Sequence, residues 1–332
     1  MGSHSTPGAG VFNGPSGRRR LALWAGAMAL FGWGLMSVGA FVRASESGLG
    51  CPDWPACHGQ LAVGGHHAMI EEFHRWVATI LVLGLVGLAV PVFRNYRDEP
   101  RVASAMRWVL ALLALQVVLG GVTVLLRNVS WTVVIHYGAA ALLVASITLL
   151  GVRLAFASQP APERDSFSRL VGWFTGLSFG LLLAGSTVAN TDSHTACGKG
   201  FPLCNGSLTP ALDHQVLINL THRVWAGAML AFVTWVLLRS RRAPRAPRPV
   251  RRAAAAVGAL YLTLAGVGVI VLAAGENTAV EVLHSSLASL TWLAIATLFA
   301  LTRTVPRTAS AETIRPTTRT LTVANTDAQI RA

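Results

Sequence analysis

Eight apolar stretches, separated by polar segments rich in Arg, Pro, Gly or Asp, divide the chain. Each stretch is long enough to cross a bilayer, which takes about 20 residues at roughly 1.5 Å per residue. The pattern predicts transmembrane helices near residues 21–43, 70–92, 104–126, 131–155, 169–190, 215–238, 253–274 and 279–302. We therefore predict an all-α polytopic membrane protein.

The second half of the chain repeats the first. ASESGLGC (44–51) resembles NTDSHTAC (190–197), and HRWVAT (74–79) resembles HRVWAG (222–227). A fixed internal period is typical of a duplicated architecture. Because each half has four spans, the two halves have parallel topology. The repeat predicts two four-helix bundles related by a pseudo-twofold axis along the membrane normal.

The same pattern predicts how the chain is organised. The N-terminal half (21–155) and the C-terminal half (169–302) are joined by a polar linker (156–168), with a cytoplasmic tail (1–20) before them and a disordered cytoplasmic tail (303–332) after them. The first apolar run is too long for the core of a cleaved signal peptide, so we predict a retained helix.

Composition supports lipid as the main solvent. Charged residues make up 12% of the chain, against about 25% in soluble domains. The net charge of +13 suggests nucleic-acid binding, but its distribution argues against that, because all but five of the 27 Lys and Arg residues fall on one predicted side. This asymmetry is the positive-inside rule. It predicts a plasma-membrane protein with cytoplasmic termini and a basic face that attracts anionic lipid.

Four histidines occupy equivalent places in the predicted helices. His74 and His136 are 62 residues apart, and so are His222 and His284. His74 lies about five residues and His136 six residues inside the outer end of its span, and His222 and His284 lie similarly in theirs, so all four share a depth of roughly 6–10 Å below the outer interface. Two imidazoles that face each other across a helical bundle suit axial ligation of a haem iron. The sequence therefore predicts one haem in each half.

Two other interpretations of these histidines remain open. Each imidazole would be an ordinary core histidine if it bonded to a neighbouring helix, although ionisable groups inside membranes are usually functional. Zinc would need three or four N or S ligands, and no third residue recurs at this depth. Arg75 and Arg223 each follow a histidine and are candidates to bind haem propionates; the alternative is that they reach to lipid headgroups.

The predicted outer loops contain all four cysteines. Cys51 and Cys57 lie in the first, and Cys197 and Cys204 lie in its repeat. An oxidising exterior permits a disulfide within each loop. Such a bridge would brace a loop over the haem site, or one pair would take part in redox or haem-transfer chemistry.

The halves differ beside the first histidine of each pair. Glu71 lies three residues before His74, whereas Asn219 lies three before His222. A carboxylate at one site and an amide at the other suggest different functions, unless Glu71 is simply an acid favoured by the dipole at a helix start. Glu281, three residues before His284, has no assigned role.

These features together resemble haem A synthase over residues 21–302. The resemblance rests on the eight spans, the loops CPDWPAC and CGKGFPLC, the segment EEFHR and the four histidines. It implies an oxidoreductase that converts a methyl group of haem O to the formyl group of haem A for terminal oxidases. Substrate haem O would lie between His74 and His136, and a haem B cofactor between His222 and His284.

The resemblance also implies site residues and partners. Glu71 matches the family's acidic residue and would act as general base or charge stabiliser; Cys51 and Cys57 match its first loop pair. Converting a methyl group to an aldehyde removes four electrons, so an electron-transfer partner is implied, beside haem O synthase and terminal oxidase assembly factors. The alternatives are a di-haem membrane electron carrier without its own substrate, and a haem- or thiol-handling transporter.

Overall fold

The computed structural model contains eight long helices within the residues that it describes. It describes residues 11–60, 64–156, 165–191, 193–198, 203–208, 210–242, 246–275 and 277–305. The helices are α1 (Gly14–Ala44), α2 (His66–Tyr96), α3 (Pro100–Leu125), α4 (Ser130–Phe156), α5 (Ser166–Asn190), α6 (His214–Arg242), α7 (Arg248–Ala274) and α8 (Thr278–Thr304). All eight are long and apolar enough to span a membrane, which confirms the predicted fold class.

The helices extend beyond the predicted apolar spans. The helix α1 begins at Gly14, seven residues before the predicted start at residue 21. Its polar first turns are held by the neighbouring helices: Arg18 forms an ion pair with Glu99, and the Tyr96 hydroxyl donates to the Phe12 carbonyl at 2.8 Å. Most of the predicted linker and C-terminal tail lies outside the described residues, and the proposed domain division stays a prediction.

Local sequence signals fix several helix starts. A proline lies in the first turn of α1, α3 and α7, where its missing N–H costs nothing. Asp165 caps α5 by accepting from the Ser168 amide, and Asn277 caps α8 by accepting from the Val280 amide. These caps satisfy backbone donors that a helix start leaves unpaired.

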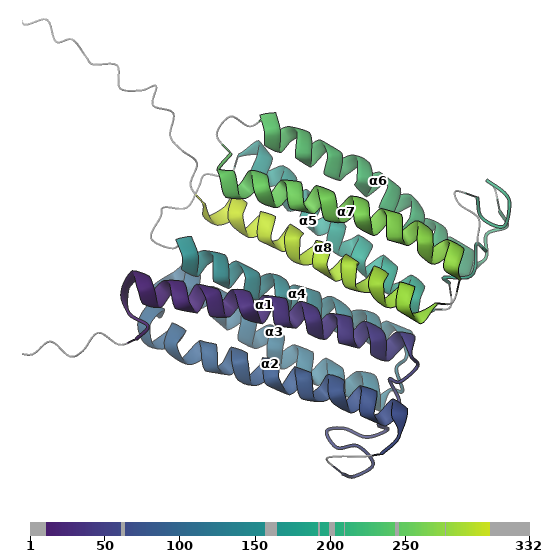
Figure 1. The fold of residues 1–332 in the computed structure, drawn as a ribbon, viewed down its shortest axis with the longest axis horizontal. Helices are drawn as coiled ribbons and strands as arrows, with labels where there is room; N and C mark the ends of the chain where they lie inside the picture. Colours follow the sequence, from purple (N-terminus) through teal and green to yellow (C-terminus); the bar gives the residue numbers. More distant parts are fainter. Residues whose placement is uncertain are drawn as a thin grey trace, which may run out of the picture.

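The helices form two groups that lie side by side (Figure 1). The helices α1 to α4 pack as one group, α5 to α8 as the other, and α1, α4, α5 and α8 make the contacts between them. One buried apolar cluster draws mainly on α1 to α4, and a second on α5 to α8. Large apolar side chains such as Leu83 and Trp173 point outward, as lipid contact allows. The pseudo-twofold relation between the groups stays a prediction.

Polar contacts at the end of the molecule that carries the cysteine loops join the two helix groups. Arg43 at the end of α1 forms an ion pair with Glu281 of α8 at 2.7 Å, and it donates to the Ala189 carbonyl of α5 at 2.9 Å. Glu281, which had no assigned role, therefore links the two groups three residues before His284.

Candidate haem sites and the loops above them

Each of the two cysteine-containing loops is closed by a disulfide. Cys51 pairs with Cys57, and Cys197 pairs with Cys204. Both loops lie at the same end of the molecule (Figure 1), and all four cysteines are buried. The second cysteine of each pair exchanges two backbone hydrogen bonds with the residue three positions later, at 2.9–3.0 Å. The two loops therefore share one local structure, and the disulfides that we predicted as permitted are formed.

The first loop is further fixed by Asp53. Its carboxylate accepts from the backbone amides of His58 and Gly59 at 2.6 and 2.7 Å. The Gly59 amide, helped by that of His58, lowers the pKa of the Asp53 carboxyl, so the side chain is ionised at neutral pH. The disulfide and these two hydrogen bonds therefore close the loop on itself.

Glu71 and Arg75 attach this loop to α2. Glu71 is 4% exposed, and its carboxylate accepts from the Cys51 amide at 2.9 Å and from the Arg75 guanidinium at 2.6 Å. The same guanidinium donates to the carbonyls of Ala56 and Asp53 at 2.7 and 3.0 Å. The ion pair therefore supports the loop as well as lying one turn from His74.

Asn219 and Arg223 hold the second loop in a similar way. Asn219 is 3% exposed, and its amide donates to the Ser193 carbonyl at 2.6 Å. Arg223 donates to the Leu203 carbonyl at 3.5 Å. Each half thus uses the residue three before its histidine to bind the loop, but the first half does so with a buried carboxylate.

All four histidines pack against a glycine of the preceding helix. A Cβ added at the glycine would lie only 3.0–3.3 Å from the imidazole Cε1, so no larger residue fits without displacing the ring. The pairs are Gly39 with His74, Gly120 with His136, Gly185 with His222 and Gly268 with His284. The glycines recur at the same offsets as the repeat, 146 and 148 residues. The recurrence of these glycines is a second sequence signal for the site, and our prediction from the spacing of the histidines did not use it.

The histidines fit the role of haem ligands. The Nδ1 atom of each is buried and has no hydrogen-bond partner among the described residues, which argues against core histidines bonded to a neighbouring helix through that nitrogen. The helices that carry each predicted pair, α2 with α4 and α6 with α8, belong to the same helix group. The structure therefore places both members of each predicted pair in one half of the molecule. Within the described residues, no three or more His, Cys, Asp or Glu side chains converge as a metal site.

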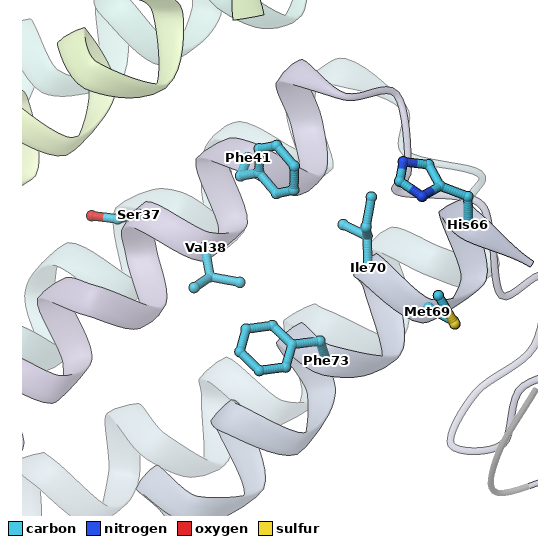
Figure 2. A pocket seen from close by; sticks show the side chains of 7 residues that line it. All are labelled: Ser37, Val38, Phe41, His66, Met69, Ile70 and Phe73. Atoms are coloured by element: carbon cyan, nitrogen blue, oxygen red, sulfur yellow. The ribbon is translucent and has the colours of Figure 1, made fainter. Parts of the chain in front are cut away.

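An apolar pocket of about 500 Å³ lies between α1 and α2 (Figure 2). One of its lining residues, Phe73, directly precedes His74 in the sequence. Phe41 and Phe73 line it, with Ile70 and His66. At the repeat offsets of 146 and 148 residues, Thr187 and Thr221 occupy the positions of the two phenylalanines. The N-terminal half is therefore more apolar next to its first histidine.

The fold and the paired histidines define a class: an eight-helix membrane protein with two candidate bis-histidine haem sites beneath disulfide-closed loops. The family model described as COX15-CtaA, Cytochrome oxidase assembly protein, matches residues 22–73, 65–148 and 127–296. The chain belongs to this family.

Curated relatives share most of this length. A protein of Symbiobacterium thermophilum named Heme A synthase is 29% identical over 280 residues, covering 81% of this chain and 91% of the relative. One of Exiguobacterium sp. with the same name is 26% identical over 278 residues, covering 81% and 89%. One of Bacillus pumilus, also named Heme A synthase, is 32% identical over 219 residues, covering 60% and 67%.

Proposed function

We propose that the chain is a haem A synthase, an oxidoreductase that converts a methyl group of haem O to the formyl group of haem A. The observation that carries the proposal is that each half has two histidines packed against glycines. The chain also aligns with nearly the full length of curated relatives that are named Heme A synthase. A di-haem electron carrier without a substrate is not favoured, because these relatives are named as synthases.

In this proposal, the two sites have different functions. His74 and His136 hold substrate haem O, and His222 and His284 hold a haem B cofactor. Two differences between the halves support this assignment. The residue that binds the loop is the carboxylate Glu71 in the first half and the amide Asn219 in the second. Phe41 and Phe73 of the first half correspond to threonines in the second. A bound haem supplies a redox-active iron, and the substrate haem supplies the methyl group.

Glu71 is the proposed proton acceptor for this oxidation. It is a buried carboxylate one helical turn from His74, and its two oxygens are fixed by Cys51 and Arg75. A fixed carboxylate near the reacting group serves as a general base without reorganisation. Arg75 positions Glu71, since its guanidinium already bonds the carboxylate and the loop carbonyls. Propionate binding by Arg75 and Arg223 stays a prediction.

The proposal also implies which proteins act before and after this one, and how the chain is oriented in the membrane. Haem O synthase supplies the substrate, an electron-transfer partner accepts the four electrons, and assembly factors for a terminal oxidase receive haem A. The protein lies in the plasma membrane with both termini inside. The test of function is expression in cells that make haem O and lack their own haem A synthase: haem A appears in the membranes only if the chain has this activity.

The orientation predicts which thiols are accessible from outside. After mild reduction of intact cells, an impermeant maleimide is expected to label Cys51 and Cys57 in the first loop. A single cysteine introduced at Ala253, at the opposite end near the basic α6–α7 connection, is the matched control and should react only after lysis. Labelling of the loop cysteines only after lysis contradicts the orientation.

A further inference from the structure

The third helix carries a polar side chain at the candidate substrate site. The Gln116 amide nitrogen lies 3.2 Å from Nε2 of His136. The Gln116 Oε1 atom is buried and has no hydrogen-bond partner among the described residues. A polar side chain with an unsatisfied oxygen is costly inside an apolar helical bundle, so its presence next to a haem-ligand candidate suggests a function.

The C-terminal half lacks this group. Gly120 of α3 and Gly268 of α7 make the same contact with their histidines, which fixes the correspondence between the two helices. Gln116 lies four residues before Gly120, and Leu264 lies four before Gly268. The first site therefore has an amide at the position where the second site has a side chain that forms no hydrogen bonds.

The chemistry of the contact is determined by the amide. A side-chain amide nitrogen only donates hydrogen bonds, so His136 Nε2 accepts and the imidazole proton is on Nδ1. This is the tautomer that binds iron through Nε2. The hydrogen bond uses the same lone pair that an iron–Nε2 bond would need.

We propose that Gln116 is a ligand-exchange residue that competes with haem iron for His136 Nε2. The inference rests on the proposed function, in which the N-terminal site must bind haem O and release haem A. When haem leaves, the iron–Nε2 bond breaks and the N–H···Nε2 hydrogen bond forms, with no change in oxidation state. Gln116 thus holds the empty ligand in the correct tautomer and lowers the barrier to release. Leu264 offers no such competition, so the cofactor haem is retained.

Haem transfer from the purified protein tests this proposal. The full-length protein in detergent is loaded with haem B at both sites and mixed with excess apomyoglobin, and the Soret band follows the transfer in time. Wild type is expected to show a fast phase from the N-terminal site and a slow phase from the C-terminal site. Gln116→Leu, the residue of the other half, and Gln116→Met, which keeps the side-chain length, should slow the fast phase about 2- to 10-fold, as expected for one hydrogen bond.

The reciprocal variant and an internal control complete the design. Leu264→Gln should accelerate the slow phase, while the phase from the unaltered site reports that each variant is folded. The proposal is overturned if both Gln116 variants leave the fast phase unchanged, or if they slow both phases equally, which would indicate a general effect on the bundle. The rates of haem transfer do not depend on product formation. If cells that express wild type contain no haem A, the proposed function is therefore refuted, while the role of Gln116 is still decided by the transfer rates.

Discussion

Replacement of His222 or His284 by alanine is expected to remove the retained haem B, whereas His74→Ala should leave most of it. An alanine cannot ligate iron, and a haem that keeps one axial histidine is held much less tightly. The histidines of the two pairs belong to helix groups with separate buried clusters, so loss of one ligand should not empty the other site. Reduced-minus-oxidised absorbance of the purified variants measures the loss.

A matched control for these variants is His214→Ala. His214 is an exposed residue at the start of α6, the helix that carries His222, so its replacement should not change the haem content. If His74→Ala abolished all haem while His222→Ala abolished none, the substrate and cofactor halves would have to be exchanged.

The second large effect is expected at Glu71. Glu71→Gln should lower haem A formation by about 10²–10⁴-fold, the usual contribution of a general base. Glutamine keeps the length of the side chain and still accepts the hydrogen bond from Cys51, so the loop and both haems should be retained. It neither takes up a proton nor carries negative charge. The measurement is pigment composition in cells that make haem O, with protein amount checked by immunoblot.

Two comparisons separate this role from support of the loop. Glu72→Gln should have little effect, because the Glu72 carboxylate accepts a hydrogen bond from the Trp76 indole of its own helix and glutamine keeps an accepting oxygen there. Arg75→Gln removes the ion pair and leaves the carboxylate, so it should cost less activity than Glu71→Gln. Equal losses from Arg75→Gln and Glu71→Gln would show that Glu71 acts only by bracing the loop, and near-normal haem A from Glu71→Gln would refute the base assignment.

The number and identity of the helices were predictable, because lipid requires long apolar runs and the chain has eight. Their ends were not. The polar residues before residue 21 continue α1 because Arg18 meets Glu99 and Tyr96 meets Phe12, and these partners are more than 80 positions apart in the sequence. Such contacts leave no local signal in the hydrophobic pattern.

The candidate site was only partly predictable, because some of its contacts also join residues that are distant in the sequence. The spacing of His74, His136, His222 and His284 identified the ligand candidates, since a duplication preserves spacing. The partners of Glu71 and Glu281 were not predictable, because Cys51 and Arg43 approach them only in the folded chain. The break in symmetry at Glu71 predicted a special role, and the structure adds a second reason for a carboxylate there: it pairs with Arg75.

The central claim is that one site keeps its haem and the other exchanges substrate for product. Extraction of the pigments from the purified protein, after expression in cells that make haem O, tests it most directly when each pigment is identified by mass. The account predicts haem B in a constant amount, together with a mixture of haem O and haem A. Two equivalents of a single haem type, with no haem A, would contradict it.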